Sequence, residues 1–280
     1  MQPRGFVIAC EMLPNLATGK AAPQPARTRP PEVVVFPYLS EQRSDGVKSP
    51  RRHDEATAMS ERVRRGIHEV FGGAVRLDFA TDDDAANGAS DLAEFLTAAW
   101  PKLRRVNFLV THRNFLANEV LQRAGLSPES FIPNAAVVHL RVTAEPSKVT
   151  KDLYLIRHCA SHNNVSHAGS ARMTTCANVD ALRRLAPLLA ARAGKVGEGD
   201  VLYGSSVLPR AVLSAIALQR PVSSAQLTQV REAFQQPAAE PEAVQAYIRD
   251  NVCGGQGAAR YQNDYCSAKA GGTFRTRQTR

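Results

Sequence analysis

The sequence predicts an α/β fold, a three-layer sandwich in which helices cover both faces of a mainly parallel sheet. Short apolar runs rich in β-branched residues, such as residues 32–39 and 106–110, are typical of strands buried on both faces. Segments with helical spacing of apolar residues lie between these runs, as in a chain of β-α-β units. Polar residues directly follow several of the runs, at the edge where sheets of this class bind ligands.

In the first half of the chain, predicted strands and helices alternate. Gly72 and Gly125 follow two helical segments and end them, since glycine readily adopts the left-handed conformation at a helix C-terminus. Ser90 and Asp91 can cap the start of a further helix. We expect strands over residues 32–39, 106–110 and 135–142, and helices over 56–70, 91–100 and 115–124.

The second half continues the alternation after a polar connector. Residues 143–151, which include Pro146, predict a loop between the two halves. Gly194 ends one helical segment, and Pro209 stands in the first turn of another, where its missing N–H costs little. We expect strands over residues 153–156 and 201–203, and helices over 178–193, 209–218 and 240–251.

These elements predict one main domain over residues 31–220. Residues 1–30 are rich in Pro, Ala and Arg and lack a hydrophobic period, so we expect a flexible arm there. Residues 221–280 form a C-terminal extension whose Gly- and Arg-rich end, from Gly254 onward, predicts disorder. The connector divides the main domain into segments 31–142 and 152–220.

The composition is that of a soluble globular protein. Hydrophobic residues make up 44% of the 280 residues and charged residues 22%. No apolar run reaches the roughly 18 residues that a membrane-spanning helix needs. The five cysteines are an odd number without a CxxC pair, so they indicate neither a zinc site, a redox motif nor a disulfide framework. We therefore expect a reducing, cytoplasmic location.

The formal charge of +9 raises the question of a nucleic-acid partner. The basic residues are scattered, for example in Arg51-Arg52, Arg104-Arg105 and the C-terminal residues 275–280, and no aromatic-rich RNA-binding motif lies between them. We expect a solvated basic surface that favours anionic substrates, and no nucleic-acid partner.

Ionisable and hydroxyl side chains follow the predicted strands directly. His112, His158 and Ser206 each come just after a strand, and Glu41 follows the first one. Because the carboxyl ends of parallel strands meet at one edge of a sheet, these side chains are expected to lie together. The sequence therefore predicts a catalytic or binding site at this edge.

Residues 155–164, Leu-Ile-Arg-His-Cys-Ala-Ser-His-Asn-Asn, resemble the signature of the histidine phosphatase superfamily, the phosphoglycerate mutase-like enzymes. In that signature a strand leads into Arg-His-Gly, an acidic residue, Ser and, three positions later, Asn. Arg157, His158, Ser161 and Asn164 match it.

Further segments resemble other elements of this family. Residues 204–211 are similar to its Ser-Ser-x-x-x-Arg-Ala element, whose arginine, here Arg210, binds phosphate. The sequence Phe-Leu-Val-Thr-His, which ends at His112, resembles the strand that delivers a second histidine, and residues 134–137 resemble the strand after it. Pro-Tyr-Leu-Ser-Glu, which ends at Glu41, resembles the element with the acidic proton donor.

The order of these elements differs from that of the family. Family members run from Arg-His through Ser-Ser-Arg and the acid to the second histidine, whereas this chain runs Glu41, His112, His158, Arg210. Rotating the family order by half a domain reproduces it. The resemblance therefore implies a circular permutation, in which the connector 143–151 joins the old ends and new ends open before residue 32.

The resemblance implies phosphoryl transfer, and the residue types fit that chemistry. A phosphoryl group in transfer spreads negative charge over its oxygens, so catalysis needs positioning and fixed positive charge. A neutral imidazole nitrogen is a competent nucleophile near neutral pH. The resemblance assigns His158 as nucleophile, His112 as a further catalytic donor, Glu41 as proton donor, and Arg157, Arg210 and Asn164 as phosphate-binding residues. No metal and no cofactor is expected.

The expected function is a phosphomonoesterase with a phosphohistidine intermediate, acting on a small-molecule or protein phosphomonoester. A phosphatase is preferred over a mutase, because no extended match to the mutases' substrate loops exists. Cys159 replaces the family's Gly, Ala160 its acid, and Arg113 a second Gly. These departures favour an alternative, an inactive relative that binds phosphorylated ligands or a protein partner. Asn164 and Ser206 also fit turn and capping roles.

Overall fold

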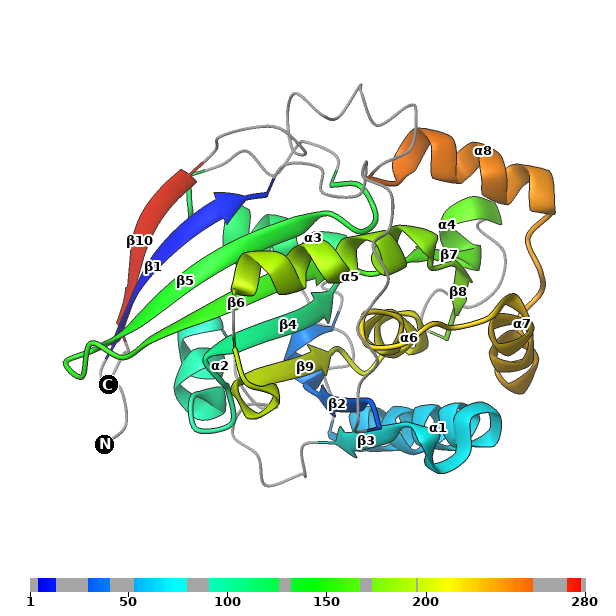
Figure 1. The fold of residues 1–280 in the computed structure, drawn as a ribbon, viewed down its shortest axis with the longest axis horizontal. Coiled ribbons are helices and arrows are strands. Elements are labelled where there is room, and N and C mark those ends of the chain that lie inside the picture. Colours follow the sequence, from blue (N-terminus) through cyan, green and yellow to red (C-terminus); the bar gives the residue numbers. More distant parts are fainter. Residues whose placement is uncertain are drawn as a thin grey trace.

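The computed structural model describes residues 5–13, 30–40, 53–79, 91–125, 132–166, 173–194, 196–253 and 271–277. An eight-stranded sheet forms the centre of the molecule (Figure 1). Its strands are β1 (Gly5–Met12), β2 (Glu32–Val35), β3 (Arg76–Phe79), β4 (Val106–Thr111), β5 (Val137–Glu145), β6 (Thr150–Arg157), β9 (Val201–Ser205) and β10 (Gly271–Arg277). A separate two-stranded sheet consists of β7 (Ala160–Ser161) and β8 (Cys176–Asn178).

The larger part of the main sheet is parallel. Across the sheet the strand order is β10-β1-β5-β6-β4-β9-β2-β3. Neighbouring strands pair in parallel from β6 through β4, β9 and β2 to β3. The pairs β10-β1, β1-β5 and β5-β6 are antiparallel. The prediction of an α/β fold with a mainly parallel sheet is confirmed.

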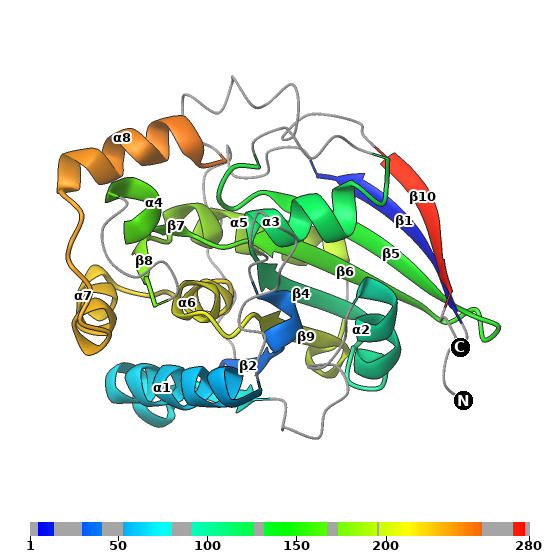
Figure 2. The same ribbon diagram turned by 180° about the vertical axis from the view of Figure 1, so that it is seen from behind.

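Helices lie on both faces of this sheet (Figures 1 and 2). Those of the described residues are α1 (His53–Phe71), α2 (Leu92–Ala99), α3 (Arg113–Phe115), which continues as the π-helix η4 (Leu116–Leu121), α4 (His162–Ser166), α5 (Asp180–Ala193), α6 (Pro209–Ala217), α7 (Ser224–Ala233) and α8 (Pro241–Asn251). Short 3-10 turns are η2 (Pro37–Leu39), η3 (Gly72–Ala74) and η5 (Glu198–Asp200).

Each face of the sheet has its own hydrophobic core. Helices α1, α5, α6 and α7 contribute to the core on one face, and α2, α3 and η4 to the core on the other. Successive strand residues point to opposite faces, so in β4 Phe108 joins the first core and Leu109 the second. A strand buried on both sides has to be apolar throughout, which explains the continuous runs in the sequence.

Local sequence signals determine several element ends. The Asp91 side chain accepts a hydrogen bond from the Glu94 amide at 2.9 Å and caps α2. Gly125 and Gly194 both have a φ of +76°, which glycine adopts without strain. The strand expected over 32–39 ends at Val35, because Pro37 has no N–H for the ladder and instead begins η2.

Residues 5–12 form β1, so the prediction of a flexible arm over residues 1–30 is wrong for this segment. β1 lies between β5 and β10 in the sheet. Phe6, Ile8 and Cys10 are 1%, 0% and 2% exposed, while Ala9 between them is exposed. This two-residue period is the pattern of a strand with one buried face. The Pro- and Ala-rich composition of the longer segment conceals it.

The C-terminal segment also contributes to the domain. Ser223 begins α7 with a capping box, in which its Oγ accepts from the Gln226 amide and the Gln226 side chain accepts from the Ser223 amide. No helix was expected over residues 224–233. Helix α8 matches the helix expected over 240–251. Strand β10 corrects the prediction of disorder for residues 271–277; residues 254–270 lie outside the described residues.

The predicted connector is the tip of a hairpin. β5 and β6 are antiparallel neighbours, and Thr143 and Thr150, near the ends of the expected loop, are cross-strand partners. Their hydroxyl oxygens lie 2.9 Å apart. Segments 31–142 and 152–220 are therefore joined by a tight turn and not by a long linker.

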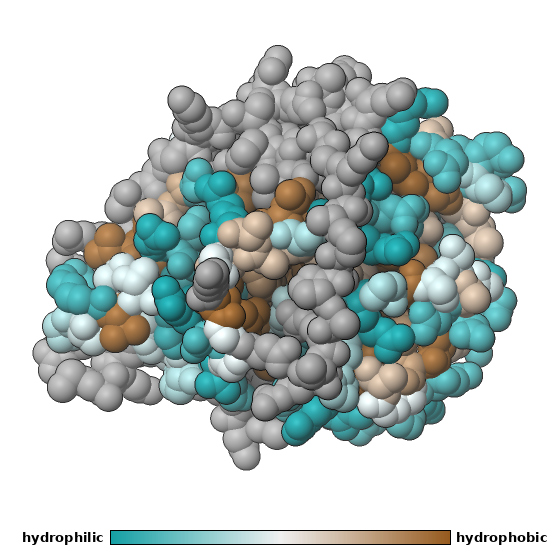
Figure 3. Space-filling model, viewed as in Figure 1, coloured by the Kyte–Doolittle hydropathy of each residue, from teal (hydrophilic) through white to brown (hydrophobic). Residues whose placement is uncertain are grey.

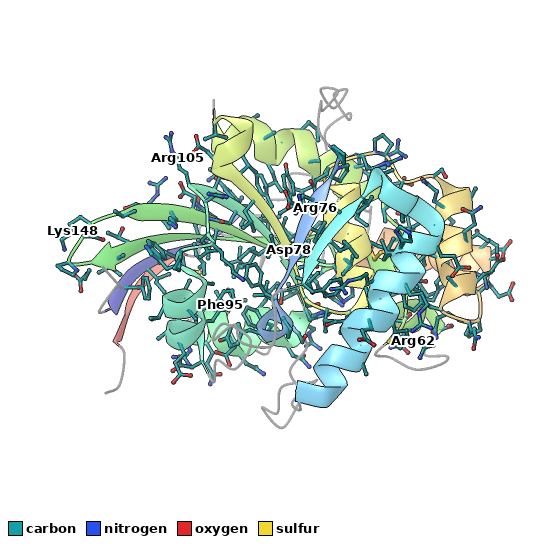
Figure 4. All side chains as sticks on the ribbon, turned by 90° about the horizontal axis from the view of Figure 1, so that it is seen from below. Arg62, Arg76, Asp78, Phe95, Arg105 and Lys148 are labelled. Carbon is teal, nitrogen blue, oxygen red and sulfur yellow. A yellow bond between two sulfur atoms is a disulfide. The ribbon has the colours of Figure 1, made fainter. Side chains whose placement is uncertain are left out.

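The described surface carries mixed polarity. On the face in Figure 3, hydrophobic residues are interspersed with hydrophilic ones, and Val149, 49% exposed, is the exposed large hydrophobic residue among the described residues. Arg62 lies on α1, Arg105 directly before β4, and Lys148 in the turn between β5 and β6 (Figure 4). Within the described ranges, no helix is long and apolar enough to span a membrane.

The role of β1 can be tested by truncating its central side chain. We expect Ile8→Ala to lower the free energy of unfolding by about 2–5 kcal/mol, because Ile8 is fully buried. Urea denaturation followed by circular dichroism measures this change. Val149→Ala, at the exposed hairpin tip, serves as control and should change stability by less than about 0.5 kcal/mol. A stable Ile8→Ala protein would mean that β1 contributes nothing to the fold.

Candidate active site

The parallel register brings three strand ends together. Thr111 at the end of β4 pairs with Arg157 at the end of β6, and Val110 pairs with Ser205 at the end of β9. His112 and His158 each follow directly after one of these strands, so both lie at the same sheet edge. The expectation that the polar strand-end residues gather at one edge holds for these described residues.

The two histidines predicted as catalytic are adjacent and buried. The ring centroids of His112 and His158 are 4.9 Å apart and the rings are tilted by 55°. His112 is 0% and His158 3% exposed. Backbone bonds fix their separation, because the His158 amide donates to the Thr111 carbonyl at 3.0 Å.

Two neighbours determine the tautomer of His158. Its Nδ1 lies 2.7 Å from the Cys159 carbonyl oxygen, which can only accept a hydrogen bond, so Nδ1 carries the proton. Its Nε2 lies 3.1 Å from Nε of Arg210, which can only donate. Nε2 is therefore the nitrogen with the lone pair, and the neutral ring presents it toward Arg210.

Among the described residues, His112 has a hydrogen-bond partner at one ring nitrogen and none at the other. Its Nε2 lies 2.6 Å from the Ser206 hydroxyl oxygen. Its Nδ1 is buried and has no hydrogen-bond partner among the described residues, and the same holds for the hydroxyls of Ser40 and Ser205. Buried polar atoms are almost always hydrogen-bonded in folded proteins. The unpartnered Nδ1 of His112 can therefore form one more hydrogen bond at this sheet edge.

Two buried arginines complete this cluster. Arg157 is 4% and Arg210 3% exposed. Arg157 is the last residue of β6 and its Nη1 donates to the Ile132 carbonyl, while Arg210 lies in the first turn of α6, next to Pro209. Two guanidinium groups in a low-dielectric environment favour the entry of an anion, since buried charge is costly without compensation.

Burial and the arginines keep both histidines neutral. Desolvation lowers the pKa of His158 well below its usual range, and the positive charges of Arg210 and Arg157 lower it further. Desolvation likewise lowers the pKa of His112 well below the usual range, with Arg210 as the next cause. Nε2 of His158 is thus unprotonated at neutral pH and accepts the hydrogen bond from Arg210.

Hydrogen bonds connect the turn after His158 to the helix that carries Arg210. The Cys159 amide donates to Oγ of Ser214 at 2.9 Å, and that hydroxyl donates to the Arg210 carbonyl at 2.6 Å. Ser214 lies one helical turn after Arg210, so it shares its face of α6. This spacing is a signal in the sequence that could have identified Ser214.

Asn134 holds the same turn from the other side. Its Nδ2 donates to the carbonyl oxygens of His158 and Cys159, at 2.9 and 2.8 Å. Asn134 is 0% exposed. The sequence indicated this residue only as the start of a strand, because the partners of a buried amide depend on the tertiary fold.

A disulfide joins Cys159 to Cys176 on β8. The expectation that the cysteines form no disulfide is therefore wrong for these two, and Cys159, directly after His158, has no free thiol. Two cysteines 17 residues apart form no recognisable framework, and β7-β8 pairing brings them together. The cytoplasmic location stays a prediction, because disulfides beside reactive groups also occur in redox-sensing proteins of reducing compartments.

Two further residues were predicted for the site, Asn164 and Glu41. Asn164, on α4, has its Oδ1 occupied by the Ser161 hydroxyl at 2.8 Å and by the Asn134 amide at 3.5 Å, which is a turn-stabilising arrangement. Its role as a phosphate ligand stays a prediction. Glu41 follows η2 and lies outside the described residues, so its role as proton donor also stays a prediction.

Neither the models of protein families, nor the curated proteins, nor the solved structures gave a match. No group of three His, Cys, Asp or Glu side chains within the described ranges is arranged to hold a metal ion.

The disulfide is expected to stabilise the fold. Cys176→Ser removes a cross-link between residues 17 apart, and we expect the free energy of unfolding to fall by about 3 kcal/mol. Urea denaturation of oxidised wild-type protein and the variant measures this loss. With a strong reductant present, the two proteins should unfold at similar urea concentrations. Equal stability under oxidising conditions would contradict the prediction.

The two neutral histidines predict a loss of stability in acid. As pH falls below about 6.5, the unfolded chain binds protons on His112 and His158 that the folded chain excludes, so unfolding becomes easier. Each histidine can contribute up to about 1.4 kcal/mol per pH unit. Urea denaturation between pH 7.5 and 5 should show a smaller slope in His158→Asn than in wild type. The control His68→Asn, on the exposed side of α1, should keep the wild-type slope.

Proposed function

We propose that this chain is a phosphomonoesterase that acts through a phosphohistidine on His158. The observation that carries the proposal is the convergence of two neutral histidines and two arginines, all nearly fully buried, at the ligand-binding edge of an α/β sheet. Attack on a phosphate dianion requires fixed positive charge around the phosphate and a nucleophile that is not protonated.

The first step is transfer of the phosphoryl group to the enzyme. The lone pair on Nε2 of His158 attacks phosphorus, a P–N bond forms, and the bond from phosphorus to the leaving oxygen breaks. The carbonyl of Cys159 holds the Nδ1 proton in place, so the imidazolium that forms is stabilised by a bond already present. The leaving oxygen takes a proton from an acid, the role proposed for Glu41.

Arg210 has to change partners when substrate enters. In the described state its Nε–H occupies the lone pair of His158 Nε2. A phosphate is a stronger acceptor than an imidazole and can take the planar donor fork of Arg210, and with it that of Arg157. This exchange would free Nε2 for attack at the moment the anion is bound.

The second step returns the enzyme to its starting state. Water attacks phosphorus, the P–N bond breaks, and inorganic phosphate leaves with the proton balance restored by a base, again the role proposed for Glu41. His112 would donate to phosphoryl oxygens in both steps. Its unpartnered buried Nδ1 supports that role, because a bound oxygen would satisfy it once this nitrogen carries the proton.

We also propose that the chain is a circularly permuted relative of the histidine phosphatase superfamily. A permutation requires that the original chain ends lie next to each other. The β5-β6 hairpin supports this, because the last residues of segment 31–142 pair with the first residues of segment 152–220. Strands β1 and β10 would then be additions at the far side of the sheet.

A second candidate is an inactive relative that binds phosphorylated ligands without hydrolysing them. The contact between Arg210 and His158 Nε2 favours it, since a guanidinium fixed on the lone pair would block attack. The near-complete burial of His158 points the same way. This candidate predicts that the protein binds phosphate but does not hydrolyse phosphate esters.

Hydrolysis of p-nitrophenyl phosphate tests the proposal. We expect wild-type protein to release p-nitrophenol, and His158→Ala to lower kcat by at least about 10³-fold because the nucleophile is gone. Arg210→Ala should lower kcat by about 10²- to 10³-fold. His68→Ala, an exposed histidine on α1, is the matched control and should retain full activity.

Trapping the intermediate separates the two candidates. Radiolabelled phosphate from a labelled substrate should attach to wild-type protein in an acid-labile, alkali-stable form and be absent from His158→Ala. Binding of inorganic phosphate or vanadate without labelling or turnover would favour the inactive relative. Turnover that persists in His158→Ala would contradict both the proposed nucleophile and the proposed mechanism.

A further inference from the structure

The ring of His158 depends on one backbone carbonyl. The Nδ1–H of His158 donates to the Cys159 carbonyl oxygen at 2.7 Å, and the direction of this bond sets where the Nε2 lone pair points. A turn carbonyl bonded only to an imidazole could rotate with its peptide group. The orientation of the lone pair would then vary with it.

The side chain of Asn134 fixes that carbonyl. Nδ2 of Asn134 has two protons, and its two nearest acceptors are the carbonyl oxygens of Cys159 at 2.8 Å and His158 at 2.9 Å, both closer than Oδ1 of Asn164 at 3.5 Å. The Asn134 side-chain amide thus donates to both carbonyls of the turn. The Cys159 carbonyl consequently accepts from two directions, from Asn134 and from the His158 ring.

Asn134 is in turn anchored to α8. The Tyr247 hydroxyl donates to Oδ1 of Asn134 at 2.8 Å. The Asn134 backbone amide donates to the Asn251 carbonyl at 3.2 Å, and the Asn134 carbonyl accepts from the Cys253 amide at 3.1 Å. Both backbone groups and both side-chain groups of this fully buried residue are therefore engaged.

We infer that Asn134 is a positioning residue for the His158 nucleophile, and that Tyr247 of α8 holds the Asn134 amide in its working orientation. The inference deepens the proposed function and rests on it for its catalytic consequence. The two carbonyls of the turn need hydrogen-bond donors, and the Tyr247 hydroxyl needs an acceptor. An asparagine side chain supplies both, through its NH₂ group and its Oδ1. The C-terminal helix α8 thereby acts on the site without touching the substrate.

Two variants test the inference with the full-length protein. Asn134→Asp keeps the size of the side chain and its acceptor but removes both donors, and we expect kcat to fall about 10²-fold with KM within about twofold. Tyr247→Phe removes one hydroxyl, and we expect kcat to fall about fivefold with KM unchanged. Tyr154→Phe, on the neighbouring strand β6, is the matched control and should keep the wild-type kcat.

Two readouts distinguish positioning from a purely structural role. The first is kcat per phosphorylatable site, with sites counted by phosphohistidine labelling, because loss of folded protein lowers the number of sites and not the rate at each. The second is the ¹⁵N NMR spectrum of the histidine rings, with His158 assigned from His158→Ala. We expect a single Nδ1–H tautomer of His158 in wild type and Tyr154→Phe, and a mixture in Asn134→Asp and Tyr247→Phe.

The outcomes separate this inference from the proposed function. An inactive wild-type protein would refute the phosphatase, and the tautomer shift would still support the positioning of His158 by Asn134. The inference would be overturned if Tyr247→Phe left both the His158 signals and kcat per site unchanged. This test remains valid if Asn134→Asp fails to fold.

Discussion

The site depends on the register of three parallel strands. Because Thr111 pairs with Arg157 and Val110 with Ser205, the residues that follow β4, β6 and β9 emerge at the same level of the sheet. A shift of one residue in either pairing would turn every side chain of the shifted strand to the opposite face. Both hydrophobic cores enforce the register, since these strands are apolar on both faces.

That register places unusual electrostatics in the interior. Two buried guanidinium groups lie near two imidazoles that desolvation keeps neutral, so the cluster carries positive charge beside uncharged rings. Positive charge taken out of water is costly unless an anion compensates it. In the proposed function a phosphate ester would supply this compensation, and the unpartnered Nδ1 of His112 would gain a hydrogen bond. Stability and the proposed function therefore depend on the same groups.

The turn after His158 is held by parts of the chain that lie far apart in sequence. Ser214 holds it from α6, Asn134 from the segment before β5, and the disulfide from β8. Through Tyr247, α8 joins this set. A turn that carries a side chain in place of the glycine of the resembled signature is thus fixed by surrounding contacts. Segments flanking residues 31–220 consequently belong to the working domain.

The sequence by itself determined the α/β class and most element boundaries, because strands buried on both faces and helix caps leave local patterns. It also placed His112, Arg157 and His158 at strand ends and Arg210 in the first turn of a helix. Only the tertiary structure decided the sheet positions of β1 and β10, the Cys159–Cys176 pair and the contacts of Asn134. Each of these depends on segments that approach one another only after the sheet has assembled. Strand partners, disulfide partners and buried amide bonds carry no local period, so no window of the sequence encodes them.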